Sequence, residues 1–97
     1  MVIVGRENLA AFTKKHRDAA KWITGWQADV TRAQWKTTSD VKARFGSASI
    51  LSGNRVVFNV KGNSYRMLTQ IDFPNAVVAV LKIGTHAEYD RWDLQRG

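Results

Sequence analysis

Hydrophobic positions in the first third of the chain take a helical spacing after a short β-branched run. Residues 2–4 are Val, Ile and Val and precede a glycine, which predicts a short strand. Over residues 7–33 the apolar side chains recur every three or four positions, at Leu9, Phe12, Ala19, Ile23, Trp26 and Val30. A break near His16, with Asp18 as a cap, and Gly25 within the pattern leave two interpretations, namely two helices or one bent helix.

The pattern changes from helical to extended after residue 54. Ahead of that point, Ser39 or Asp40 is expected to cap a short helical turn. Three strands joined by tight turns at Gly62-Asn63 and Pro74-Asn75 are predicted over residues 55–61, 65–73 and 76–83. A helical segment follows over residues 86–92. Helices before a meander of strands predict one α+β domain over residues 1–97, with N-terminal helices on a small antiparallel sheet and a short C-terminal helix.

The composition excludes several classes of protein. Of the 97 residues, 44% are hydrophobic and 10% aromatic, which is enough apolar surface to make intrinsic disorder implausible. The lack of cysteine removes disulfides, thiolate metal sites and cysteine nucleophiles. No apolar run approaches the roughly 18 residues of a membrane span, and the apolar N-terminus is too short for a signal peptide. We therefore expect a cytoplasmic protein without membrane contact.

Positive charge is concentrated in the first three quarters of the chain. Lys and Arg number 15 and Asp and Glu number 8, which gives a net charge of +7. Residues 1–71 carry 12 basic and 4 acidic side chains, whereas residues 72–97 carry 3 basic and 4 acidic ones. A basic surface of this kind either keeps a protein soluble or attracts RNA or DNA, and charge alone does not decide between the two.

The hairpin around Gly62-Asn63 brings polar side chains together. A two-residue turn at these positions pairs Asn59 with Arg66. It also pairs Lys61 with Ser64. Because strand side chains alternate, these four residues then share one face, beside Asn63 in the turn. The cluster suits contacts to phosphate and ribose, although an ordinary solvated face has the same composition.

A second candidate group follows the last strand. His86 suits proton transfer because its unperturbed pKa, about 6.5, lies near working pH. Tyr89 lies three residues later on the same helical face, and Asp90 lies four residues later, within reach of the imidazole. A capping histidine and a core tyrosine would leave the same pattern. Two histidines without cysteine, and no Gly-rich phosphate loop, give no reason to expect a metal or another cofactor.

The second half of the chain carries a family resemblance. The segments Val57-Phe58-Asn59-Val60, Gly62-Asn63, Tyr65-Arg66 and Ile83-Gly84-Thr85-His86-Ala87-Glu88-Tyr89-Asp90 closely resemble HigB-type toxins of bacterial type II toxin–antitoxin systems, within the RelE/ParE superfamily. The resemblance is specific over residues 55–90 and looser over residues 1–54. It implies an α+β toxin that cuts mRNA, typically on the ribosome. It also implies neutralisation by a helix-turn-helix antitoxin of the HigA type encoded next to it.

On this resemblance, roles in RNA cleavage can be assigned to residues. Cleavage without a metal uses the 2′-hydroxyl of the substrate to attack the neighbouring phosphate, so the protein must move protons and supply cations where charge develops. We assign proton transfer to His86, the phosphate in the transition state to Arg66, and orientation or stacking of the substrate to Tyr89. The expected RNA contacts are Asn59, Lys61, Asn63 and Lys82, with Asp90 in a supporting role.

Lys82 departs from the family pattern. Toxins of this type often have a basic residue at the position that Leu81 occupies here. A regular two-residue turn at Pro74-Asn75 pairs Lys82 with Met67, on the face opposite Arg66. A bulge or a slipped register would bring Lys82 to the Arg66 face.

Two other functions stay open at this point. A gyrase-directed toxin of the ParE branch would share the fold without needing His86, Arg66 and Tyr89. A small basic module that binds RNA or the ribosome would use His86 and Tyr89 only as structural residues. Mapping of mRNA cuts and of DNA damage in cells after brief induction would separate the three functions.

Overall fold

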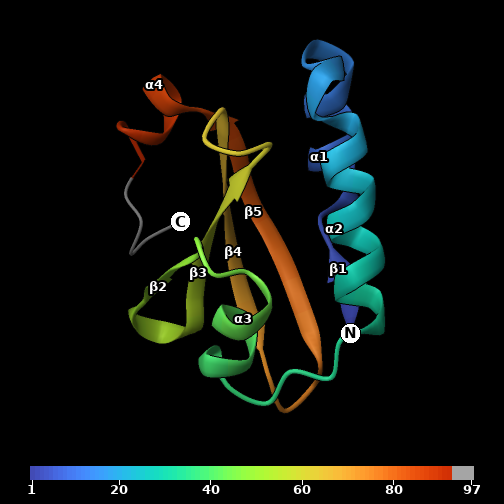
Figure 1. Cartoon of the computed structure of the whole chain (residues 1–97), viewed down its shortest axis with the longest axis vertical. Helices are drawn as coiled ribbons and strands as arrows, with labels where there is room; N and C mark the ends of the chain where they lie inside the picture. Colours follow the sequence, from blue (N-terminus) through green and yellow to red (C-terminus); the bar gives the residue numbers. More distant parts are fainter. Residues whose placement is uncertain (93–97) are drawn as a thin grey trace.

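The computed structural model describes residues 1–92. Its elements follow along the chain as β1 (Val2–Val4), α1 (Arg6–Lys15), the 3₁₀ turn η1 (Arg17–Ala19), α2 (Ala20–Arg32), α3 (Thr38–Arg44), β2 (Ser49–Leu51), the 3₁₀ turn η2 (Ser52–Asn54), β3 (Arg55–Val60), β4 (Tyr65–Asp72), β5 (Val77–Thr85) and α4 (His86–Tyr89). The strands form one sheet in the order β1-β5-β4-β3-β2 (Figure 1). The predicted α+β fold class is confirmed.

The sheet is mixed, whereas the sequence predicted an antiparallel one. Strands β2 to β5 pair antiparallel as a meander, but β1 pairs parallel to β5, with Val2 opposite Val77. Strands β1 and β5 are far apart in the sequence, with the helices and the other strands between them. No local turn signal can predict a pairing between such distant segments. The short β2 was also missed, because its side chains are mostly exposed and show no alternation.

The first helical pattern forms two helices, one of the two interpretations of the sequence. His16 ends α1 with φ −131° and ψ 73°, which lies outside the helical region and explains the break. Asp18 does not cap α2, as the sequence had suggested. Ala19 occupies the N-cap position, without a side-chain hydrogen bond, and Asp18 lies one residue earlier in η1.

The cap of α3 also differs from the prediction. Neither Ser39 nor Asp40 is the N-cap residue. Thr37 takes that position and accepts a hydrogen bond from the Asp40 backbone, while the Asp40 carboxylate accepts one from the Thr37 backbone. This reciprocal capping box is a stronger start signal than either residue alone.

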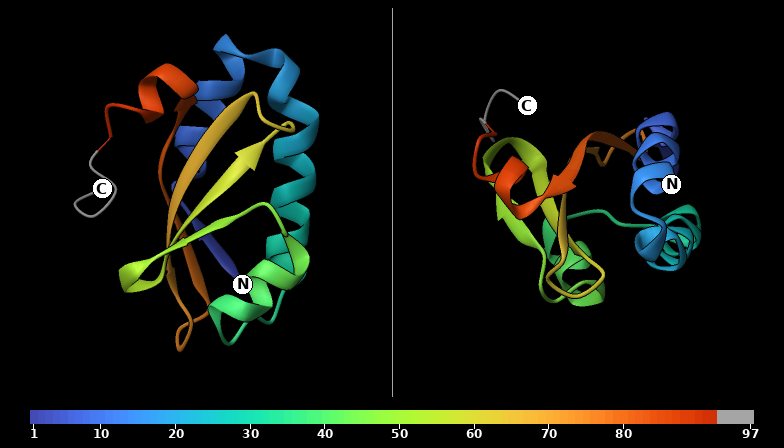
Figure 2. Two further views of the ribbon diagram at one scale, coloured as in Figure 1. Left: turned by 60° about the vertical axis from the view of Figure 1, so that its left-hand side comes forward. Right: turned by 90° about the horizontal axis from the view of Figure 1, so that it is seen from above.

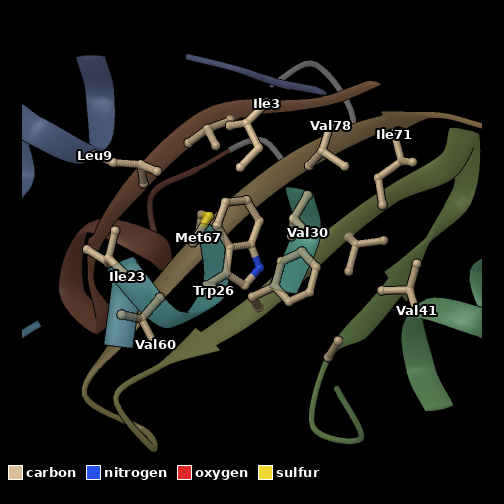
Figure 3. Packing of buried hydrophobic residues seen from close by; sticks show 14 of the residues in the cluster. Ile3, Leu9, Ile23, Trp26, Val30, Val41, Val60, Met67, Ile71 and Val78 are labelled. Atoms are coloured by element: carbon tan, nitrogen blue, oxygen red, sulfur yellow. The ribbon is translucent and has the colours of Figure 1, made fainter. Parts of the chain in front are cut away.

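The hydrophobic core lies between the helices and one face of the sheet. Helices α1 and α2 run side by side along that face (Figure 2). The Trp26 ring is 1% exposed and packs edge-on against Phe58 at 5.5 Å, in the middle of the cluster (Figure 3). Trp26 belongs to the apolar helical pattern of the sequence, and in the structure that pattern faces the core. Within residues 1–92, the helices are too short or too polar to cross a membrane.

Candidate active site

The predicted hairpin register sets the first part of the site. Asn59 on β3 pairs with Arg66 on β4, as the sequence predicted, and Arg66 pairs with Gly84 on β5. The adjacent pair, Phe58 and Met67, is buried in the core on the helix side. Alternation therefore directs Asn59 and Arg66 to the opposite side of the sheet, which is called the site face below.

A β-bulge brings Lys82 to the site face. Thr69 pairs with Val80, but Leu68 pairs with Lys82, so Leu81 has no counterpart on β4. The regular turn at Pro74-Asn75 holds only up to the bulge, and the predicted pairing of Lys82 with Met67 is wrong. Lys82 is instead in register with Leu68, two residues from Arg66 and on the same face. The extra residue reverses the alternation of every position after it.

The β3–β4 turn joins the two predicted groups of polar residues. The Asn63 side-chain oxygen accepts a hydrogen bond from the Arg66 guanidinium at 3.0 Å. Its backbone carbonyl meets the imidazole Nε2 of His86 in a close contact. One turn residue thus contacts the candidate phosphate-binding cation and the candidate proton carrier together.

Aromatic rings border the cations of the site face. The Arg66 guanidinium lies over the Tyr89 ring at 5.6 Å, and the Lys82 ammonium lies over the Trp92 ring at 6.0 Å. The two rings contact each other edge-on at 5.6 Å between their centroids. Cations held against ring faces keep their charge near a surface on which a base could stack.

A capping box fixes the start of α4 and therefore the backbone of His86. Thr85 is the N-cap, and its hydroxyl accepts from the Glu88 N–H at 3.2 Å, while the Glu88 carboxylate accepts from the Thr85 N–H at 3.0 Å. The hydrogen bond from the Thr85 backbone is the main reason why the pKa of Glu88 is lowered. Gly84 is buried beside this box. A Cβ at this position would approach the Glu88 carboxylate oxygen to 3.0 Å.

Lys61 does not share the site face, which corrects the prediction from strand alternation. Pairing of β3 with β4 ends at Val60, and Lys61 takes a left-handed backbone with φ 50°. Its ammonium turns to the helix side and forms an ion pair with Asp18 at 3.0 Å. The alternation rule fails at Lys61 because the residue belongs to the turn rather than to the strand.

Two other predicted residues have separate environments. The Asn59 side chain donates to the Ser47 carbonyl at 3.4 Å, a contact with the segment before β2. Asp90 is exposed at the end of α4, where its backbone N–H donates to the His86 carbonyl at 3.0 Å. The ring partner that His86 has in the structure is the carbonyl of Asn63, and Asp90 was the partner suggested by spacing.

Sequence reasoning gave Asp18 only a capping role and left Trp92 unassigned. Asp18 contacts Lys61 and Tyr65, which lie 43 and 47 residues away along the chain. No local sequence pattern predicts such a contact. The one unusual feature of Asp18 in the sequence is that it is an acidic residue among basic ones. Trp92 follows Tyr89 at helical spacing, which could have suggested the ring pair.

The site therefore offers cations, an imidazole, amides and aromatic rings. In residues 1–92, no three His, Asp or Glu side chains gather closely enough to hold a metal ion. Guanidinium, imidazole and amide groups suit recognition of a phosphodiester and movement of a proton. These are the groups needed to bind or cut a nucleic acid.

Comparison with known families identifies the kind of protein that carries this site. Residues 19–92 match the family model described as HigB toxin, the RelE-like toxic component of a toxin–antitoxin system. The chain belongs to the HigB toxin family. A comparison with curated proteins gives no match.

Membership of the HigB toxin family implies an antitoxin partner, because these proteins are the toxic components of two-part systems. The matched residues include β3, β4, β5 and α4, and therefore every site residue predicted from the sequence. They do not include β1, α1 or Asp18.

Proposed function

We propose that this HigB-family toxin is a metal-independent endoribonuclease that cuts mRNA in the cytoplasm. The observation that carries the proposal is the double contact of Asn63, which meets Arg66 through its side chain and His86 through its backbone. A cation for the phosphate and a proton carrier are thereby held against one turn. Either residue alone would be compatible with a structural role.

The proposed reaction is an internal phosphoryl transfer. The ribose 2′-oxygen forms a bond to the neighbouring phosphorus, and the bond from phosphorus to the 5′-oxygen breaks. A proton leaves the 2′-hydroxyl and a proton joins the departing 5′-oxygen. The products are a 2′,3′-cyclic phosphate and a free 5′-hydroxyl, so no water or metal enters this step.

His86 is the proposed proton carrier. A carbonyl oxygen can only accept a hydrogen bond, so the contact with Asn63 assigns the ring proton to Nε2. With that proton on Nε2, Nδ1 is the nitrogen proposed to exchange a proton with the substrate. The same contact orients the ring, as a backbone carbonyl does for many histidines that transfer protons.

Arg66 and Tyr89 are proposed to bind the reacting nucleotides. Arg66 presents a planar guanidinium that stabilises charge on the phosphate in the transition state. Tyr89 stacks on or orients a base next to it, with the guanidinium at 5.6 Å from its ring. Asp90 has only the lesser role of supporting the electrostatics of α4.

Further RNA contacts are proposed along the site face and its turn. Asn59, Asn63 and Lys82 offer hydrogen bonds or charge to the backbone and base edges. Lys61 belongs to the turn and is the weakest member of the set, since its ammonium is on the helix side, paired with Asp18. We also propose that the net charge of +7 favours the ribosome as the place of cleavage.

The antitoxin implied by the family is proposed to be a helix-turn-helix protein of the HigA type. Neutralisation would then need only that the antitoxin keep RNA away from the site face. Co-expression of a candidate antitoxin with the toxin tests this part, because growth should be restored by the cognate partner.

The test of the function is the mapping of mRNA 5′ ends after brief induction. The wild-type toxin should give discrete cuts, and His86→Ala and Arg66→Ala should abolish them while the proteins stay folded. DNA damage without cuts would instead indicate a gyrase-directed toxin. If neither appeared, the protein would be a binding module, and the endoribonuclease proposal would be wrong.

A further inference from the structure

A second polar cluster lies on the helix side of the sheet, next to the turn that carries Asn63. The Asp18 carboxylate accepts hydrogen bonds from the Tyr65 hydroxyl at 2.8 and 2.9 Å. It also pairs with the Lys61 ammonium at 3.0 Å. One carboxylate in η1 therefore holds the first residue of the β3–β4 turn and the first residue of β4.

The Tyr65 side chain is fixed by the rings around it. It packs edge-on against Phe12 at 5.1 Å and lies tilted against His16 at 5.0 Å. His16 in turn stacks on Phe12 at 4.4 Å. Rings in these positions hold the Tyr65 hydroxyl toward Asp18, so the contact is part of the packing between helices and sheet.

The turn itself needs such a contact. All four residues from Lys61 to Ser64 are exposed, and a single backbone hydrogen bond of 3.3 Å, from Ser64 N–H to Lys61 carbonyl, closes it. Lys61 and Gly62 are both left-handed, with φ 50° and 64°. A lysine in this region is strained and persists where the surroundings hold it. Asp18 supplies that hold.

The two segments that position the candidate site, the β3–β4 turn and the start of α4, are each connected to a residue that Asp18 contacts. Lys61 leads through the turn to Asn63, which meets Arg66 and His86. Tyr65 pairs in the sheet with Thr85, the residue that caps α4. Movement of either contact would therefore change the position of Asn63 or of the helix that carries His86.

We propose that Asp18 is a positioning residue, which fixes the β3–β4 turn so that Asn63 can hold Arg66 and His86 together. Its consequence for cleavage rests on the proposed function, whereas its effect on the turn does not. Asp18, Phe12 and His16 all precede the residues matched by the family model. The first helix and η1 thus contribute to the site without lining it.

The first test is nuclear magnetic resonance of the Asp18→Asn protein in the absence of RNA. The variant keeps the shape of the side chain and removes its charge. The backbone order parameters of Gly62 and Asn63 should fall from the rigid range, about 0.85, toward the flexible range below about 0.6. The His86 ring nitrogens should change chemical shift, because the Asn63 carbonyl no longer stays in place.

Asp29→Asn is the matched control. Asp29 also holds two cations, Arg32 and Arg44, but its position on α2 has no contact with the turn. It should leave the signals of Gly62, Asn63 and His86 unchanged. Exchanging the charges, with Asp18→Lys and Lys61→Asp in one protein, should restore part of the order that Asp18→Asn removes.

Cleavage measurements separate this proposal from the proposed function. If the toxin cuts RNA, Asp18→Asn should lower kcat about tenfold to a hundredfold, because Asn63 would no longer hold Arg66 and His86 in place. KM should change less, since Tyr89 and Lys82 lie outside the turn. If the turn loosens but no protein cuts RNA, the positioning role stands and the endoribonuclease proposal fails. Unchanged order parameters and ring shifts in Asp18→Asn would overturn the positioning role whatever the cleavage result.

Discussion

At the scale of single residues, Arg66 has the most informative surroundings. Its guanidinium donates to the Asn63 side chain at 3.0 Å and lies 5.6 Å from the centre of the Tyr89 ring. A planar, forked cation can keep both contacts and still present N–H groups to a phosphate. A lysine ammonium has no plane to lay on the ring and no second fixed donor.

Arg66→Lys should therefore lower RNA cleavage although it keeps the charge. Removal of one preorganised donor typically costs about 10²- to 10³-fold in kcat, and the loss should lie in that range. The control is Arg32→Lys, since Arg32 is an exposed helix residue paired with Asp29. Single-turnover cleavage of an mRNA fragment measures the difference, and equal rates for the two variants would contradict the role of Arg66.

At the scale of elements, the start of α4 depends on the space left by Gly84. A Cβ at this position would lie 3.0 Å from the Glu88 carboxylate oxygen and 3.2 Å from the Glu88 Cβ. To accommodate the added methyl group, Glu88 must move by a few tenths of an ångström, which strains its hydrogen bond to the Thr85 N–H. His86 is the first residue after this cap, so the capping box fixes the position of its backbone.

Gly84→Ala should lower the free energy of unfolding by about 1 kcal/mol, the usual cost of losing a helix cap, and should reduce cleavage. Gly25→Ala is the matched control, because nothing lies within 4 Å of a Cβ there and the residue is inside α2. That substitution should raise stability by about 0.5–1 kcal/mol. Thermal unfolding distinguishes the two; a Gly84→Ala protein as stable and active as wild type would show that the box is dispensable.

Acid should weaken the hydrogen bonds of Asp18 and Asp72 and the ion pair of Asp18. The Tyr65 hydroxyl, and then Lys61, keep the pKa of Asp18 below its ordinary value, and Asn75 does the same for the pKa of Asp72. A carboxyl with a lowered folded pKa stabilises the fold above its unfolded pKa, and the stabilisation is lost as pH falls through the folded pKa. Asp72→Asn should thus lower the unfolding midpoint at neutral pH, and the difference from wild type should shrink in acid. A difference that stayed constant with pH would contradict this.

The elements differ in how well the sequence predicted them, for physical reasons. The pairing of Asn59 with Arg66 was predictable because the Gly62-Asn63 turn signal is local and fixes the register of the hairpin. The bulge at Leu81 leaves no local turn signal, and only the displaced position of Lys82 relative to the family pattern pointed to it, as one of two alternatives. Lys61 was misplaced because alternation was carried one residue past the end of β3. The contacts of Asp18 with Lys61 and Tyr65 could not be found, because these residues meet it only in the folded chain.

At the scale of the whole molecule, the net charge of +7 bears on the proposed binding of RNA. Helices α1 and α2 cover one face of the sheet (Figure 2). Arg66 and Lys82 lie on the other face, the site face. Binding that depends on phosphate contacts releases counterions and weakens with salt. On the proposed function, the charge would attract RNA to the molecule and the site face would select where it is cut.

RNA binding by a His86→Ala protein should weaken steeply with salt. For single-stranded RNA, the logarithm of the association constant should fall with the logarithm of salt concentration by about 0.7 for each phosphate contacted. Lys82→Ala should reduce this slope, whereas Lys21→Ala on the exposed side of α2 should leave it unchanged. Fluorescence anisotropy of a labelled oligonucleotide gives the slope, and a salt-independent affinity would contradict binding through phosphates.

The most direct test of the central claim is cleavage of a defined mRNA by purified wild-type and Arg66→Ala proteins, with ribosomes present. The account predicts discrete cuts by the wild-type protein, each leaving a 2′,3′-cyclic phosphate and a 5′-hydroxyl, and loss of these cuts in a folded Arg66→Ala protein. Equal cutting by both proteins, or no cutting by the wild type, would contradict it.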